Sequence, residues 1–484
     1  MRACFCFFAV VALTLSVFAD EIPSQPENIN VKPLNFTPPD VKQEKMENGG
    51  MLFVLPDSEA PLIKLFIIFR GGSMTDPKDK LGLCAFSVEM LKSGGCGSLS
   101  PEALDENIDS LGAHLSFSTE IESVTISLYV LSEEFEKALK LLFDILSKPR
   151  FDEEAIKSRK NIWLENLRQI YEHSSNIAGL LFKRALYSDS PYANPTEGLP
   201  ETVSKISRED IVTWHKKWIQ PQNMYIGLTG PVTDSTVSLV KEVFGKWKVE
   251  GENEKLPEIK IEQKEGLRIY LFERKGLEQV LILVGSLSAE RAHPERPVLD
   301  ALEYIIHTRI NLKVREESGL AYSAYATHQA CSKAGIFYAA AQTKTSTAVE
   351  ALRLMVEQLR LAKTALPTTD AIRCIKDHFL NSFIFRFAEK GRLLQEVLWL
   401  KFYGFADDHL TKYCDRIREL GPDTLVEAGG KFINTDALTA VLVGEVSGLK
   451  NDLKKEFSNA KILELTSFDI IEVEKKKEEE KKGD

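Results

Sequence analysis

The chain has 484 residues, too many for one ordinary hydrophobic core, so two to four domains are expected. Hydrophobic residues make up 44% of it and charged residues 27%, which is ordinary globular composition and excludes a mostly disordered protein. The formal net charge of -10, without a basic stripe, argues against nucleic acid as a partner and fits a peptide or protein better.

The first segment reads as a secretory signal peptide. Arg2 precedes an apolar run over residues 3–18, and Val17 and Ala19 supply the small residues that a signal peptidase reads. The run is shorter than the ~20 residues of a spanning helix, which favours cleavage after Ala19 over a membrane anchor. No other segment approaches that length, so we expect a mature chain without a membrane span, located in the periplasm or secreted.

The cysteines do not form a disulfide pattern. Of the seven, Cys4 and Cys6 lie in the signal peptide, and no CxxC spacing occurs. The remaining five are Cys84, Cys96, Cys331, Cys374 and Cys414. Buried free thiols are the favoured interpretation, with one bridge between Cys84 and Cys96 open as the alternative in an oxidising compartment.

Composition shifts divide the rest of the chain. A polar lead follows the signal peptide, a polar stretch with Gly251 and Pro257 separates two apolar regions, and the last residues are almost all charged. The predicted parts are a signal peptide at 1–19, an extended arm at 20–47, a first domain at 48–248, a linker at 249–258, a second domain at 259–470 and a charged tail at 471–484.

An internal repeat relates the two domains. An apolar strand runs into Gly71 in the first and into Gly285 in the second, 214 positions later. A second apolar strand ends at Gly230 in the first and at Gly444 in the second, again 214 positions apart. Two landmarks at one offset predict a tandem duplication.

Strands alternate with longer helical patterns within each domain. Residues 122–131 alternate like a half-buried strand, and residues 133–146 carry apolar side chains at helical spacing. Ser207 and the acidic residues after it mark another helix start, with Pro221 beyond its end. The predicted fold class is α+β: two tandem homologous domains, each a mainly antiparallel sheet packed against helices.

The stretch from Arg70 to Leu91 resembles the front of the pitrilysin/insulinase-type zinc metallopeptidases, in which a helix carries H-x-x-E-H. Two His four residues apart bind zinc on one helical face, and the Glu takes the proton of the attacking water. The aligned positions here are Ala85, Val88 and Glu89. Ala and Val can neither bind a metal nor move a proton, so the resemblance implies a degenerate site.

The family's third zinc ligand is a Glu on a later helix, and Glu165 lies at about the expected distance. A relic ligand and a plain solvated glutamate are both open interpretations of it. The family's second Glu, seven residues earlier, is Ser158 here, and no two of the eight His lie within four residues of each other. We therefore expect this chain to bind no cofactor, with zinc on a partner subunit.

Two further stretches resemble the family's substrate-binding parts. Residues 111–119, with Ala113, His114 and Leu115 at their centre, are similar to the strand on which family substrates pair through backbone groups. An ordinary sheet edge with a structural His114 is the alternative. Residues 309–325 are similar to the family signature R-L-x-x-x-L-R-E-x-x-G-L-A-Y-S-x-Y.

In that signature an Arg and a Tyr hold the substrate backbone near the scissile bond, at zinc held by the other half. They map to Arg315 and Tyr322, which could supply fixed donors to a carbonyl and a hydroxyl to a developing oxyanion. The alternative is that Tyr322 packs in the core.

The resemblance covers residues 48–470 and implies a function. Some family members are pairs of chains, of which one holds zinc and the other lacks it but keeps the Arg and Tyr. This implies a substrate-binding or regulatory subunit, inactive alone, of a heterodimeric zinc metalloendopeptidase that degrades peptides. A scaffold or chaperone-like module is one alternative, and an active metallopeptidase with an unrecognised metal site is the other.

Overall fold

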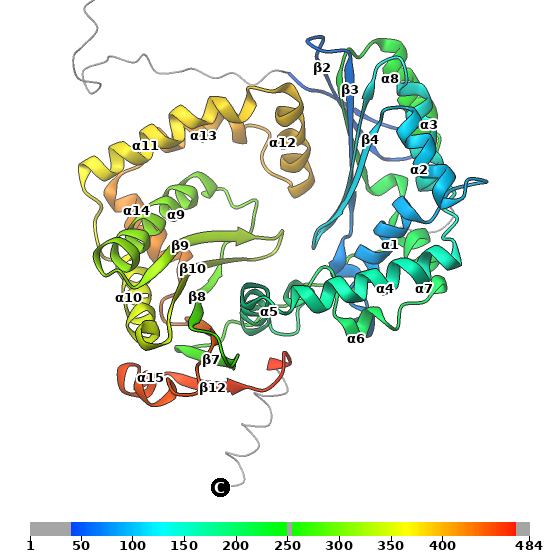
Figure 1. Ribbon diagram of the computed structural model, residues 1–484. Helices are drawn as coiled ribbons and strands as arrows, with labels where there is room; N and C mark the ends of the chain where they lie inside the picture. Colours follow the sequence, from blue (N-terminus) through cyan, green and yellow to red (C-terminus); the bar gives the residue numbers. More distant parts are fainter. Residues whose placement is uncertain (1–39, 249–253, 471–484) are drawn as a thin grey trace, which may run out of the picture. The chain divides into compact units, whose positions relative to one another are not determined.

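The computed structural model describes residues 40–248 and 254–470 (Figure 1). The predicted signal peptide, the arm up to residue 39, half of the linker and the charged tail lie outside the described residues. Among the helices that are described, none is both long and apolar enough to cross a membrane.

The described part of the first half contains a six-stranded sheet in the order β1-β2-β6-β3-β5-β4. The central strand β6 runs parallel to β2 and antiparallel to β3, and the other neighbours are antiparallel. The strand bounds are β1 Lys42–Lys45, β2 Met51–Pro56, β3 Leu62–Arg70, β4 His114–Thr119, β5 Ser123–Leu131 and β6 Met224–Gly230. The predicted strand at 122–131 is therefore β5, and the end of the predicted arm is the edge strand β1.

The second half repeats this arrangement in a sheet of the order β12-β7-β11-β8-β10-β9 among the described residues. Here β11 runs parallel to β7 and antiparallel to β8, as β6 does between β2 and β3. The bounds are β7 Arg268–Glu273, β8 Gln279–Ser288, β9 Ala321–Ala330, β10 Gly335–Lys344, β11 Thr439–Gly444 and β12 Lys461–Leu465. Only the outermost strand differs, since β12 comes from the end of its half and runs parallel to its neighbour. The predicted fold class is confirmed.

Gly230 and Gly444, which form one of the two repeat landmarks, occupy equivalent places. Each ends the central strand of its sheet with a positive φ, 126° and 153° respectively. A Cβ at Gly230 would lie 2.4 Å from the Leu62 carbonyl oxygen, and one at Gly444 would lie 2.6 Å from that of Gln279. Side chains are excluded at both places by the neighbouring strand, so this landmark of the duplication is confirmed.

The other landmark needs a correction. β3 and β8 hold the same place in their sheets, but their equivalent residues Leu62 and Gln279 are 217 positions apart, not 214. Gly285 therefore lies inside β8, opposite Tyr338, whereas Gly71 follows the end of β3. A three-residue shift between the two halves makes the agreement of these two glycines accidental.

The helices confirm the expected boundaries closely. The helix predicted at 133–146 is α3, and Ser207 caps α7 through a capping box, with its side chain accepting from the Asp210 N–H at 3.2 Å. The first half contributes α1 Leu83–Ser93, α2 Pro101–Ser110, α3 Phe135–Ser147, α4 Glu153–Ile170, α5 Ser174–Tyr187, α6 Pro200–Val203, α7 Arg208–Trp218 and α8 Asp234–Val240. The second contributes α9 Arg296–Ile310, α10 Ala348–Leu361, α11 Thr369–Phe383, α12 Lys390–Tyr403, α13 His409–Arg418, α14 Pro422–Phe432 and α15 Lys450–Glu456.

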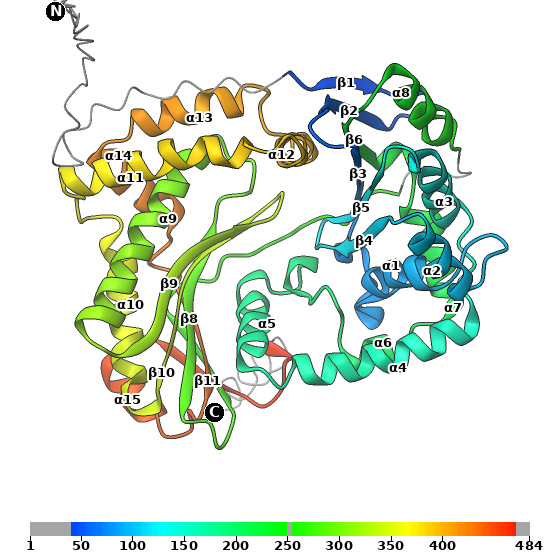
Figure 2. The same ribbon diagram turned by 45° about the horizontal axis from the view of Figure 1, so that its top comes forward.

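Two helices are exchanged between the halves. α5 belongs to the first half, yet Ile177, Leu181 and Phe182 share a core with residues of the second sheet (Figure 2). α12 belongs to the second half and packs on β6 of the first sheet, where a Cβ on Gly227 would come within 2.4 Å of the Leu398 Cδ1. Each sheet is therefore covered in part by the other half, which ties the two folds together.

All five cysteines in the described part of the chain are free thiols. Cys84 and Cys96, the pair considered for a bridge, are both buried and unbonded. Burial raises the pKa of Cys96 to about 11, so this thiol stays protonated at neutral pH and behaves as a small apolar side chain.

Candidate functional site

The helix that corresponds to the zinc helix is α1, and its start is firmly built. Gly82 precedes it with φ 91°, and the side-chain oxygens of the partly buried Asp76 accept the N–H groups of Gly82 and Cys84 at 2.7 and 2.8 Å. These bonds satisfy two of the donors that a helix N-terminus leaves open. Burial raises the pKa of Asp76 to about 8, against the lowering effect of the same hydrogen bonds.

The residues at the metal-motif positions of α1 have structural contacts. Ala85 and Val88 are buried, and Val88 is part of the apolar core of the first half. Glu89 forms an ion pair with Arg159 of α4, with 3.6 Å between Nη1 and Oε1. Within the described ranges, no group of three or more His, Cys, Asp and Glu side chains is placed to hold a metal ion.

Glu165 is a solvent-exposed, ion-paired residue of α4. Its carboxylate pairs at 3.1 Å with Arg168, on its own helix α4, and its side chain is 59% exposed. α4 meets α1 instead through Trp163, whose ring lies edge-on to Phe86 with 5.8 Å between centroids. An aromatic contact and an ion pair therefore occupy the helix interface in which the family holds zinc, and the residues present do not fit that metal.

The predicted substrate strand lies at a sheet edge. β4 pairs with β5 on one side and is the last strand of its sheet in the described residues. His114 begins it, is exposed, and stacks on Tyr129 of β5 at 5.9 Å between centroids. Ala113 just precedes the strand, and Leu115 is partly buried. An edge with free backbone groups can accept a further strand.

Tyr322 stands out from the edge strand of the second sheet. Its side chain is 90% exposed, so the alternative of core packing is wrong. In β9 the pairing with β10 passes from Ser323 to Ala321, which leaves Tyr322 as the extra residue of a β-bulge. Bulges turn a side chain out of the regular alternation and are frequent beside active sites.

Arg315 lies on an element that packs against the strand of Tyr322. It belongs to a π-helical segment, Asn311–Glu317, that continues α9 and packs on β9. Its side chain is exposed, and its guanidinium has no hydrogen-bond or ion-pair partner in the part of the chain that the structure describes. π-helical turns recur at functional sites. The structure thus leaves both members of the predicted pair accessible.

Comparison with known proteins identifies the family. Residues 53–199 match the family model described as insulinase (peptidase family M16), and residues 205–377 match the model described as the peptidase M16 inactive domain. The chain belongs to peptidase family M16. This is the pitrilysin/insulinase-type group that the motifs of both halves resemble.

M16 relatives of this chain include both zinc proteases and a non-peptidase. An uncharacterized zinc protease of Rickettsia felis is 25% identical over 328 residues, which cover 66% of this chain and 77% of that protein. The non-peptidase homolog YmxG of Helicobacter pylori is 24% identical over 302 residues, covering 61% of this chain and 68% of that one.

Solved structures share the M16 fold. A peptidase M16 inactive domain from Pseudomonas fluorescens has a TM-score of 0.75 at 21% identity and covers 84% of this chain and 98% of its own. A protease from Helicobacter pylori has a TM-score of 0.76 at 17% identity and covers 84% and 100%. These likenesses support the architecture of two related domains.

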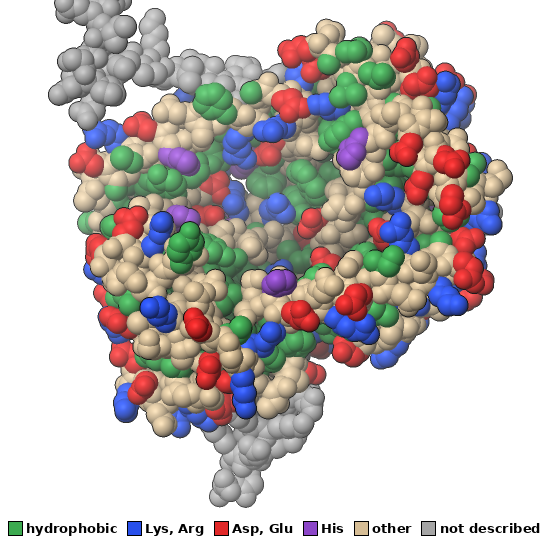
Figure 3. All heavy atoms as spheres, in the orientation of Figure 1, with side chains coloured by type: hydrophobic (Ala, Val, Ile, Leu, Met, Phe, Trp, Pro, Cys, Tyr) green, Lys and Arg blue, Asp and Glu red, His purple; other side chains and the backbone are tan. Residues whose placement is uncertain are grey.

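The structure contains a further candidate binding site that the sequence patterns did not predict. Two adjoining cavities, of about 450 and 410 Å³, share Arg291, Trp399 and Tyr403 in their walls. Figure 3 shows this face hollowed at its centre, with apolar, basic and acidic side chains in the hollow. The i, i+4 pairs Arg296 with Asp300 on α9 and Trp399 with Tyr403 on α12 are local signals, but the segments that carry them are far apart in the sequence.

Proposed function

We propose that this chain is the substrate-binding subunit, without zinc of its own, of a heterodimeric M16 metalloendopeptidase that degrades peptides. The observation that carries the proposal is a contrast between the halves. The motif positions of α1 are filled by packing, whereas a β-bulge leaves Tyr322 90% exposed and Arg315 is exposed without an ion-pair partner among the described residues. A purely structural role would leave no reason to expose these two side chains together.

The chemistry of the pair suits a peptide at a reacting centre. The Arg315 guanidinium offers several N–H donors in a fixed plane, which can hold a substrate carbonyl. The Tyr322 hydroxyl can donate to the oxyanion that forms when a peptide carbonyl is attacked. Neither group can activate water, so the zinc and the general base would come from a homologous, zinc-bearing partner subunit.

The substrate would bind in extended form. β4 and β9 each form one edge of their sheet in the described residues, and each offers backbone groups for a further strand. His114 and its neighbours Ala113 and Leu115 lie on one of these edges, and Tyr322 lies on the other. The predicted signal peptide supports a periplasmic or secreted location for the complex.

The test is to recover the partner with the tagged chain from its native host and to assay the pair. Peptide turnover should depend on both chains and on zinc held by the partner. Arg315→Ala or Tyr322→Phe should lower the turnover by about 100- to 1,000-fold, the usual cost of losing one donor to an oxyanion. Gel filtration should show that both variants still associate with the partner.

The control is Arg353→Ala, which removes a partly exposed, ion-paired arginine of α10 in the same half. It should leave turnover unchanged. Full activity in both Arg315 and Tyr322 variants would contradict the proposal and favour a scaffold or chaperone-like module. Zinc-dependent cleavage by the chain alone would contradict it in the opposite direction.

A further inference from the structure

The two adjoining cavities lie away from the Arg315 and Tyr322 surface. The first is lined by the end of β9, the starts of α9 and α13, and the helices α11 and α12. The second continues it toward the turn between β4 and β5 and toward α5. Each volume, about 450 and 410 Å³, is in the range of sites for small ligands or a few residues of peptide.

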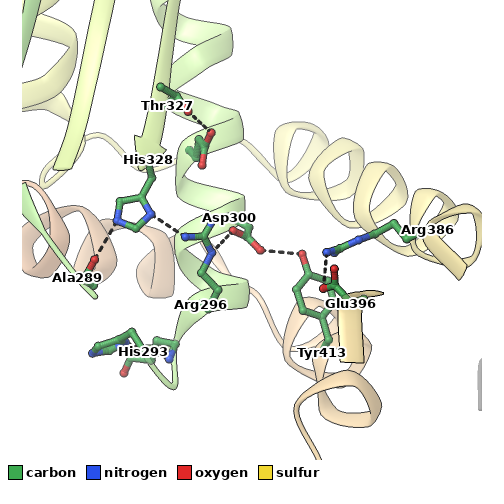
Figure 4. A network of polar contacts seen from close by, with 11 residues as sticks. Ala289, His293, Arg296, Asp300, Thr327, His328, Arg386, Glu396 and Tyr413 are labelled. Carbon is green, nitrogen blue, oxygen red and sulfur yellow. Dashed lines mark hydrogen bonds and ion pairs between the residues drawn. The ribbon is translucent and has the colours of Figure 1, made fainter. Parts of the chain in front are cut away.

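A connected polar network forms one wall of the first cavity (Figure 4). The Arg296 Nε donates to Asp300 at 2.6 Å, and its Nη1 donates to His328 Nδ1 at 2.7 Å. The Tyr413 hydroxyl donates to the second Asp300 oxygen at 3.0 Å. Since arginine only donates, Nδ1 of His328 is the acceptor and Nε2–H donates to the Ala289 carbonyl oxygen at 3.1 Å.

This arrangement keeps His328 neutral and directs positive charge at the cavity. Burial, together with the guanidiniums of Arg296 and Arg291, lowers the pKa of His328 to about 3. Among the described residues, no acceptor is bonded to the Arg296 Nη2, so donor capacity remains unused.

Arg291 is the cation that both cavities share. Its Nη1 donates to the Tyr403 hydroxyl at 3.0 Å, and the guanidinium carbon lies 4.4 Å from the centre of the Tyr403 ring. Within the described ranges it has no carboxylate partner, unlike Arg296 with Asp300 and Arg386 with Glu396 at 3.1 Å. It is thus free to bind a carboxylate brought by a ligand.

Apolar and acidic groups define the rest of the space. Trp399 and Tyr403 stand in both walls, and Phe383 stands in the first. Glu120 and Glu122 line the second cavity together with Lys183. The two carboxylates outnumber the one lysine at that end and disfavour a ligand with several negative charges, whereas a chain that is negative at one end and neutral along its length suits both cavities.

We propose that the joined cavities bind the C-terminal end of a peptide, with its carboxylate on Arg291 and Arg296 and an apolar last side chain against Trp399 and Tyr403. That the ligand is a peptide rests on the proposed function. The anchor would select the free ends of peptide substrates or products over internal segments of folded proteins.

The experiment measures binding to the full chain without a partner, so it is independent of the turnover assay. The probes are N-acetyl-Ala-Phe as the free acid, the same compound as the C-terminal amide, and inorganic phosphate. Titration calorimetry is paired with tryptophan fluorescence, for which Trp399→Phe gives the background, because the other four Trp lie in the first half.

The free acid should bind one to one and change the Trp399 fluorescence, and the amide should bind at least about 10-fold more weakly. Arg291→Gln should weaken binding of the acid by about 10- to 100-fold and abolish the preference for acid over amide. Because Arg291 is exposed, this variant should remain folded. Arg353→Gln, which makes the same charge change outside the cavities, should bind like the wild type.

Three results would overturn the inference: no binding of the acid, equal binding of acid and amide, or an unaltered affinity in Arg291→Gln. Phosphate that binds as well as the acid would mean a simple anion site and would also exclude a peptide end. Failure here together with a sensitive Arg315 and Tyr322 pair would leave the proposed function intact, because the two measurements involve different surfaces.

Discussion

The two halves of the molecule share one topology but have opposite surfaces at their functional positions. In the first half, Val88 of α1 is buried in the core and Glu89 forms an ion pair with Arg159. The motif positions of this helix therefore serve packing. In the second half, a π-helical turn and a β-bulge leave Arg315 and Tyr322 exposed. The difference teaches that two copies of one fold can diverge. In one copy the functional positions are filled by packed side chains, and in the other they stay accessible to a ligand.

The same contrast holds where the halves meet. β6 presents Gly227 to Leu394 and Leu398 of α12, whereas its counterpart β11 presents Val441 to the core formed with α5. The first sheet contacts α12 at a glycine, where no side chain separates helix and strand. The second sheet contacts α5 through apolar side chains. The halves are therefore interdependent although their strand orders match.

The largest expected effect comes from restoring the motif glutamate in the closed half. Val88→Glu should lower the free energy of unfolding by about 3–5 kcal/mol, because it places an uncompensated carboxylate in an apolar core. Urea denaturation measures the change. Glu165→Ala, at a 59% exposed side chain of α4, is the control and should stay within about 0.5 kcal/mol of the wild type. A stable Val88→Glu that binds zinc would show that the closed half is still a metal site.

The next effect tests the exchanged helix. Leu398→Ala should cost about 2–5 kcal/mol, since a fully buried side chain of α12 would leave a cavity against the first sheet. Amide hydrogen exchange should accelerate in β6, although the substitution lies in the other half. Leu312→Ala, at a 46% exposed position, should change neither quantity. Unchanged exchange in β6 would show that the halves are energetically separate.

The smallest expected effect is the pH dependence of the free energy of unfolding, to which one buried His in each half contributes. Burial lowers the pKa of His215 in the first half to about 4 and that of His328 in the second to about 3. The unfolded chain takes up protons near pH 6.5, so the free energy of unfolding falls as the pH drops from there toward 4. Each His should contribute a loss of about 2 kcal/mol between pH 7 and 5.

Urea denaturation at pH 7, 6 and 5 measures this slope for the wild type, His215→Gln and His328→Gln. Each variant should lose stability at pH 7, because His215 donates to the Leu146 carbonyl oxygen and His328 belongs to the Arg296 network. Its slope should nevertheless be shallower than that of the wild type. A slope that neither variant reduces would contradict the neutral, buried state of both rings.

Much of this protein follows from its sequence. The alternation of apolar and polar residues predicted β5, the helical spacing of apolar residues predicted α3, and the Ser207 cap predicted the start of α7. Such elements depend on local hydrogen bonds and on which face of the element is buried. The motif positions Ala85, Val88 and Glu89 also predicted a degenerate zinc helix, because side-chain chemistry alone excludes them as a ligand set. The Gly71 and Gly285 agreement misled, because a three-residue shift in a loop is invisible to a spacing argument.

Only the tertiary structure decided the rest. It placed Tyr322 in a bulge, because the register between β9 and β10 depends on the pairing of two strands. It exchanged α5 and α12 between the halves, and it gathered Arg291, His328 and Tyr403 around two cavities. The physical reason is the same in each case: packing and charge act through space between residues far apart in the chain, whereas the sequence pattern reports only neighbours within a turn or a strand.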